Sequence, residues 1–184
     1  MAINWQKLAS FLPEVSKPLK KKLGFNEKLK WTGIVLLLYF TLLHIPLYGL
    51  GQNSLEQFEA LSTILGASFG SLISLGIGPI VTASIVLQLL VGSGILNMDM
   101  TKPSDRAKFQ AMQRITQIGF VTLEAIIYVF MGGLAPDPAL IGTTSYLPLQ
   151  LALAFQLFIG GYMILLMDEL VQKWGFGSGI GIFI

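Results

Sequence analysis

The chain has no cysteine, a single histidine and few charged residues. Its 184 residues are 12% charged and 53% hydrophobic. The absence of cysteine excludes disulfides, thiolate metal sites and cysteine nucleophiles, and one histidine leaves a zinc site without enough ligands. Soluble domains contain about 25% charged residues, so this composition cannot supply a surface that faces water. The chain therefore has the composition of a membrane protein.

Basic residues are missing from two of the connections between the apolar segments. The 12 lysines and arginines lie before the first apolar segment, between the second and the third, and after the fourth, apart from Arg114 near the start of the third. The connections at 52–59 and 135–145 contain none. Basic loops are retained in the cytoplasm. The pattern predicts a multi-pass protein of the cell membrane whose N-terminus is cytoplasmic.

Segment lengths predict an all-α bundle of transmembrane helices, because about twenty apolar residues cross a bilayer. The predicted order is a cytoplasmic segment at 1–30, spans at 31–48, 71–91, 109–131 and 147–167, and the start of a truncated fifth span at 178–184. Gly160 and Gly161 in the fourth span predict a face for close helix packing.

The region between the first two spans does not read as a regular span. Residues 54–70 have apolar side chains at helical spacing but are too short and too polar to cross a bilayer, which predicts a plug-like half helix enclosed by protein. An external amphipathic helix fits equally well. Gly76, Gly78 and Pro79 then interrupt the second span. Interrupted helices point to a substrate path in transport proteins, and a kinked packing helix is the plainer alternative.

Two other functions have weak support in the sequence. Glu124 lies within the third span, which favours a secondary transporter, although a hydrogen bond to a neighbouring helix explains the acid equally well. Ser178 between two glycines resembles part of an intramembrane protease motif. However, Phe176 stands where that motif has glycine, and His44 lies near the opposite face of the membrane. We therefore expect no catalytic residue, cofactor or metal.

Four motifs together resemble the SecY family of protein-translocation channels, in its archaeal form. They are GIGPIVT at 76–82, QLLVGSG at 88–94, KLKWTG at 28–33 and GSGIGIFI at 177–184. The resemblance runs from about residue 27 to the last residue. It implies the first, five-span half of a ten-span channel with two pseudosymmetric halves.

The resemblance also implies roles for individual residues. The ring of aliphatic side chains that closes the pore corresponds to Ile77, Val81, Ile180 and Ile184. The plug corresponds to Leu55, Phe58, Leu61, Ile64, Leu65 and Phe69. Polar positions of the lateral gate correspond to Thr82, Gln88 and Gln113. An apolar constriction excludes water and ions, while flexible aliphatic side chains can yield to a passing peptide.

The partners implied by the resemblance are those of a passive channel. They are the remaining five spans, a SecE-type subunit, a small Sec-beta-type subunit, a translating ribosome, signal sequences and nascent polypeptides, and membrane lipid. The energy for transport is then expected to come from these partners and not from the chain itself.

Overall fold

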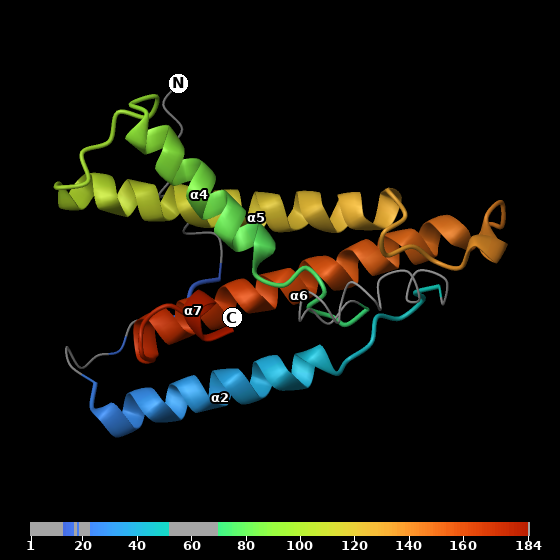
Figure 1. Ribbon diagram of the computed structural model, residues 1–184, viewed down its shortest axis with the longest axis horizontal. Helices are drawn as coiled ribbons and strands as arrows, with labels where there is room; N and C mark the ends of the chain where they lie inside the picture. The colour runs from blue at the N-terminus through green and yellow to red at the C-terminus, as the bar shows by residue number, and fades with distance from the viewer. Residues whose placement is uncertain (1–12, 17, 19–22, 52–69, 184) are drawn as a thin grey trace.

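The computed structural model describes residues 13–16, 18, 23–51 and 70–183 (Figure 1). Its α-helices are α2 (Phe25–Leu43), α4 (Gly78–Gly92), α5 (Pro103–Phe130), α6 (Tyr146–Trp174) and α7 (Ile180–Phe183), with a short 3-10 helix η1 (Pro138–Leu140). Within these ranges the pairing of extended backbone is limited to one isolated bridge between Pro46 and Ser71. The predicted all-α fold class is confirmed.

Helix α6 is the centre of the bundle. It lies between α2 and α5, α4 packs across α5, and α7 returns toward α2 (Figure 1). One apolar cluster joins α6 to α2 through Ile164, Val171 and Val35. A second joins α6 to α5 through Leu157 and Val121. Both clusters depend on α6, so its neighbours are placed through it.

Two helices begin earlier than the predicted spans. Helix α2 begins at Phe25 and includes Glu27, Lys28 and Lys30 in its first turns, whereas the span was predicted from residue 31. Helix α5 begins at Pro103, six residues before its predicted span. Proline suits the first turn of a helix, where its missing N–H is not needed. The length of an apolar segment reflects the thickness of the bilayer. The hydrogen-bonded helix can continue beyond that segment into polar surroundings, so it begins earlier than the predicted span.

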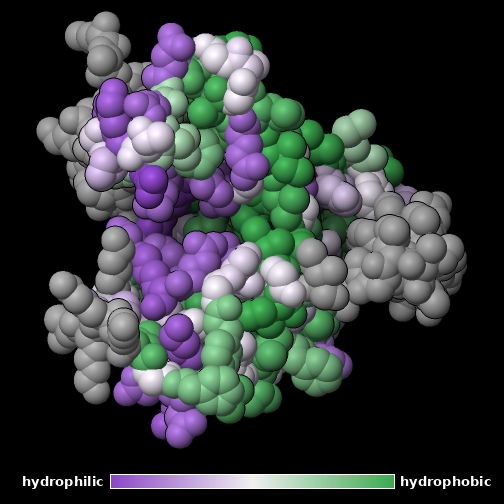
Figure 2. Space-filling model, turned by 60° about the vertical axis from the view of Figure 1, so that its left-hand side comes forward, coloured by the Kyte–Doolittle hydropathy of each residue, from purple (hydrophilic) through white to green (hydrophobic). Residues whose placement is uncertain are grey.

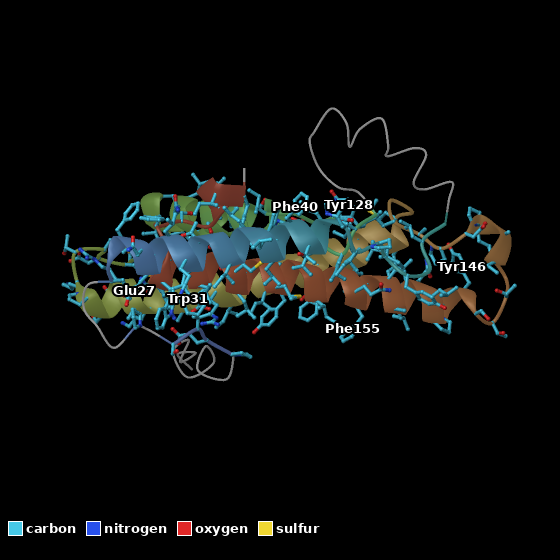
Figure 3. The ribbon with its side chains drawn as sticks, turned by 90° about the horizontal axis from the view of Figure 1, so that it is seen from below. Glu27, Trp31, Phe40, Tyr128, Tyr146 and Phe155 are labelled. Atoms are coloured by element: carbon cyan, nitrogen blue, oxygen red, sulfur yellow. The ribbon has the colours of Figure 1, made fainter. Side chains whose placement is uncertain are left out.

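Length and composition allow a membrane crossing for one helix of the described ranges, α6, with 29 residues. Helix α4 is apolar but has only 15 residues. The first turns of α2 and α5 are charged, which reduces the apolar fraction of both helices. Many large side chains exposed on the sides of the bundle are nevertheless apolar, as Phe40 and Phe155 illustrate (Figure 3).

The helix in the second predicted span begins at Gly78, seven residues later than predicted. Residues 71–77 form the isolated bridge to Pro46 and the turns that follow it instead of helix. Gly76 has a φ of +57°, which is a left-handed conformation that glycine adopts without strain. Pro79 lies in the first turn of α4, and its ring prevents a helix from continuing back through the preceding residues.

The turns at 71–77 lie directly on α6 because α6 has two adjacent glycines there. A Cβ atom on Gly160 would lie 1.8 Å from the carbonyl oxygen of Leu72. A Cβ atom on Gly161 would lie 2.6 Å from a methyl carbon of Val121 on α5. A larger residue would force the backbone of Leu72 to move at the first position and the side chain of Val121 at the second. The predicted close packing at this glycine pair is confirmed.

Charged side chains gather at one end of the bundle, where α2 and α5 begin and α6 ends. We call this the charged end (Figures 1 and 2). Of the described basic residues, Arg114 lies deepest along its helix and the others lie near the helix ends. The opposite end, called here the loop end, contains residues 44–51 and 131–145. There Gly51 N–H donates to the Ala135 carbonyl at 3.0 Å.

Candidate functional site

The helix break places two of the predicted pore-ring residues on one side of α4. Ile77 is the N-cap residue of α4, and the N–H of Val81 donates to the Ile77 carbonyl at 3.0 Å. Residues four apart on a helix lie on the same face. Both side chains are partly buried. Ile77 packs against the apolar cluster between α2 and α6, and Val81 lies one turn further along α4.

The third predicted ring residue, Ile180, is the first residue of α7. It packs against the same apolar cluster as Ile77. The structure thus brings Ile77 and Ile180, about a hundred residues apart in sequence, to one cluster. Ile184 lies outside the described residues, and the arrangement of a complete ring stays a prediction.

Asp168 fixes the reversal of the chain between α6 and α7. Its Oδ1 accepts the Ile180 N–H at 3.1 Å, and its Oδ2 accepts the Gln172 amide at 2.7 Å. The carboxylate is buried. A Cβ on Gly179 would lie 2.7 Å from the Asp168 Cα, so glycine is required for this approach. A buried carboxylate with these partners positions Ile180, a role that was not predicted for Asp168.

A polar contact joins α4 to α5. Ser84 Oγ accepts the side-chain amide of Gln113 at 2.9 Å and that of Gln117 at 3.1 Å. The Ser84 hydroxyl donates to the Ile80 carbonyl of its own helix at 2.8 Å. Gln117 is buried, so this contact satisfies an amide that would otherwise lack a partner in an apolar setting.

Gln113 was predicted as a gate position, whereas Ser84 and Gln117 were not. The spacing of Gln113 and Gln117 by four residues is a signal that could have identified the second amide, since such residues share a helix face. The other two predicted gate residues, Thr82 and Gln88, are exposed on α4. The Thr82 hydroxyl donates to the Gly78 carbonyl at 2.9 Å, within its own helix.

Glu124 lies beside the helix break. A Cβ on Gly78 would be 3.9 Å from Oε2 of Glu124, which places the carboxylate next to the first residue of α4. The amino end of a helix carries a partial positive charge that favours an anion. This location gives the acid of the third predicted span a favourable electrostatic contact with the start of α4.

The protease alternative has no support in the geometry. Phe25 and Phe176 rings are 5.2 Å apart, so the segment that contains Ser178 lies near the amino end of α2. His44 lies at the carboxyl end of α2, and its Nδ1 is 2.8 Å from the Phe40 carbonyl. At 1.5 Å per residue the helix separates Phe25 from His44 by about 28 Å. A serine–histidine pair does not form.

The predicted plug falls on residues whose structure is not described. Leu55, Phe58, Leu61, Ile64, Leu65 and Phe69 all lie within 52–69, outside the described residues. The plug assignment stays a prediction. The described residues on either side are close together: Leu47 N–H donates to the Gly70 carbonyl at 2.8 Å, and Leu72 N–H to the Ile45 carbonyl at 2.8 Å.

Fold and composition together define a class: a helical membrane protein with apolar sides, an interrupted helix and charged residues gathered at one end. The SecY family model matches residues 71–184. The protein translocase subunit SecY of Methanothermobacter thermautotrophicus is 49% identical over 182 residues, which cover 98% of this chain and 38% of that protein. The SecY subunit of Archaeoglobus fulgidus is 46% identical over 175 residues, 94% of this chain and 35% of that protein. The chain belongs to the SecY family.

Solved structures agree with this assignment. A structure of a protein-conducting channel has a TM-score of 0.78 and 42% identity, and the match covers 96% of this chain and 39% of that one. Sec61 in the canine ribosome-channel complex has the same TM-score, identity and coverage. The chain thus spans well under half the length of the relatives it matches. The predicted resemblance is confirmed, and these relatives are named as translocase subunits and channels, not as solute transporters or proteases.

Proposed function

We propose that the chain forms the amino-terminal part of the central subunit of a protein translocase, which passively conducts unfolded polypeptides across the membrane and laterally into it. The observation that carries the proposal is the 49% identity to a SecY translocase subunit over 98% of this chain. The chain needs no catalytic residue for this function. It supplies a path, and energy comes from its partners.

The pore ring is assigned to Ile77, Val81, Ile180 and Ile184. The assignment is supported by the common cluster against which Ile77 and Ile180 pack, and by the i, i+4 relation of Ile77 and Val81. Aliphatic side chains at a constriction repel water and ions, so the resting channel is sealed. The plug assignment to residues 54–70 rests on the family resemblance.

The lateral gate is assigned to the α4–α5 pair, both to exposed residues of α4 and to the polar contact between the two helices. Its proposed residues are Thr82, Gln88 and Gln113, to which we add Ser84 and Gln117. Thr82 and Gln88 are exposed in this chain, which suits a surface that meets the remaining five spans. Exchange of hydrogen bonds across such a surface gives two states whose populations a signal sequence can shift.

The proposed orientation places the charged end in the cytoplasm of the cell and the loop end outside. The described basic residues near the charged end support this orientation. The proposed partners are the five remaining spans, a SecE-type subunit, a small Sec-beta-type subunit and a translating ribosome. A ribosome is present in the canine complex to which the chain is similar.

Conductance tests the ring assignment. In the full-length channel, Ile77→Ser together with Val81→Ser should raise the resting ion current across a planar bilayer, because a polar constriction stays hydrated. Leu37→Ser is the control, since Leu37 is exposed on the outer side of α2. Unchanged current in the double variant would contradict the assignment.

Crosslinking gives a second readout of the same path. Single cysteines at positions 77 and 81 should react with a translocating chain that is stalled in the pore, while a cysteine at position 37 should not. A reversed pattern, with reaction at 37 alone, would place the path elsewhere.

A further inference from the structure

Four charged side chains form a cluster at the charged end, outside the proposed pore and gate. Lys173 Nζ lies 2.7 Å from Glu169 Oε1 and 2.6 Å from Glu14 Oε1. Arg114 lies 3.1 Å from Glu169 Oε2 and 3.9 Å from Glu14 Oε2. The cluster therefore joins α5, α6 and the segment 13–16, which precedes α2.

Without the segment 13–16, the remaining three side chains of the cluster carry a net positive charge. Arg114, Glu169 and Lys173 are only 12%, 15% and 14% exposed, and together they carry two positive charges and one negative charge. Glu14, at 56% exposure, supplies the second negative charge. Removing one partner from a poorly solvated charge group is costly, because the remaining charge loses its counterion. Arg114 on α5 and the carboxyl end of α6 thus present a net positive charge to an acidic group.

The same helices also bind the backbone of the segment. Arg114 donates to the Pro13 carbonyl, Lys173 Nζ to the Val15 carbonyl at 2.6 Å, and Trp174 Nε1 to the Ser16 carbonyl at 2.8 Å. Three carbonyls of a four-residue segment without regular secondary structure are held in this way. Carbonyl contacts to charged donors are stronger than contacts between neutral groups. Residues of α5 and α6 therefore contact both the backbone carbonyls of this segment and the carboxylate of Glu14.

We propose that residues 13–16 are a strap that docks into a clamp formed by Arg114, Glu169, Lys173 and Trp174, and that the docked strap braces α5 at Arg114. Gln113, which binds Ser84 on α4, is the residue before Arg114. Release of the strap removes two of the contacts that hold Arg114 and loosens α5 next to that bond. Docking itself is independent of the proposed function, whereas the effect on the gate rests on it.

Limited proteolysis measures the docking. A glutamate-specific protease cleaves after Glu14 only when the surrounding segment leaves the clamp and enters the protease cleft. When opening and closing are fast, the cleavage rate follows the population of the open form. The full-length protein with an N-terminal tag, reconstituted in liposomes, should release the tag slowly at low salt. Release should accelerate in about 0.5 M salt, because screening weakens ion pairs.

Two variants in the clamp leave the cleavage site intact. Lys173→Gln and Trp174→Phe should each raise the cleavage rate after Glu14 by about fivefold, since the first removes a positive charge and the second an N–H donor that contact the strap. Lys102→Gln is the matched control for charge, because Lys102 pairs with Asp99 in its own loop at 3.4 Å. Trp31→Phe is the control for ring packing, because the Trp31 and Trp174 rings are 5.3 Å apart.

The outcomes are distinct. Equal cleavage rates in the parent protein and the Lys173→Gln and Trp174→Phe variants would overturn the strap. Equal acceleration by Lys102→Gln or Trp31→Phe would also overturn it, because the effect would then not come from these bonds.

Transport of a reporter with a shortened signal sequence measures the brace. If the strap holds α5, Lys173→Gln should raise the export rate of this reporter by severalfold and leave a reporter with a strong signal unchanged. Faster proteolysis without faster export would overturn the brace and retain the docking. If the parent protein exports neither reporter, the result would count against the proposed channel function and not against the strap.

Discussion

The glycine at position 160 gives the sharpest test of how the interrupted helix is held. In Gly160→Ala the new Cβ would lie 1.8 Å from the Leu72 carbonyl oxygen, 1.2 Å inside the 3.0 Å that such atoms keep. Its other close neighbour is the Leu72 carbonyl carbon at 2.7 Å. Both neighbours are backbone atoms, so no side chain can rotate away. The turn at 71–77 must shift relative to α6.

The magnitude follows from two opposing terms. Overpacking of a filled site costs about 1–3 kcal/mol. Replacing a helical glycine by alanine contributes about 1 kcal/mol in the opposite direction. The upper part of the range applies because the clash is with backbone, which leaves a net loss of about 2 kcal/mol. A chain of this size loses about 2–4 °C in its midpoint for each kcal/mol, and a longer one loses less.

Thermal unfolding of the purified full-length protein in detergent measures this loss. Gly119→Ala on α5 is the matched control, because a Cβ there has nothing within 4 Å and the helix-propensity gain is the same. We expect Gly160→Ala to melt several degrees lower and Gly119→Ala to melt at or above the parent temperature. Equal midpoints for the two variants would refute the close contact between α6 and Leu72.

Three further predictions concern single hydrogen-bonding groups. Ser84→Ala leaves the buried Gln117 amide without its acceptor and should cost about 1–3 kcal/mol, so its thermal midpoint should fall; an unchanged midpoint would contradict the contact. Asp168→Asn keeps an oxygen that can accept the Ile180 N–H, so this variant should retain the parent export rate. Asp168→Ala lacks the acceptor and should export more slowly. Equal export rates for the two variants would contradict the positioning role. The hydroxyl and N–H of Thr101 hold the pKa of Asp99 below its usual value, so this bonding favours the ordered loop at neutral pH and is lost as pH falls through the lowered value. An NMR titration of Asp99 should show a midpoint that Thr101→Val raises, and an equal midpoint in the variant would contradict this.

The sequence predicted the helical class because apolar length and the distribution of basic residues report directly on the bilayer. It predicted helix ends less well. The first turns of α2 contain Glu27, Lys28 and Lys30. A prediction from apolar length misses helical turns made of polar residues. At the second span the glycines and Pro79 indicated an interruption, but the exact start at Gly78 depends on how residues 71–77 pack on α6.

Site residues were predictable only where the family motif or local spacing carried them. Ile77 and Val81 came from the motif, and Gln113 from its match to the gate. The partners of Arg114 could not be predicted, because Glu169 and Pro13 are 55 and 101 residues away in sequence. Ser84 looks like any small polar residue of a span until the amides of Gln113 and Gln117 are placed against it.

The unequal covering of α6 along its length has a consequence for the surrounding lipid. Leu147, Leu151 and Phe155 in the first turns of α6 are exposed, whereas residues 156–171 are buried or partly buried. Acyl chains can therefore cover this helix most fully over its first turns. A fluorescent probe at position 151 should be quenched by brominated lipid, and one at position 164 should remain bright at every depth of the bromine label.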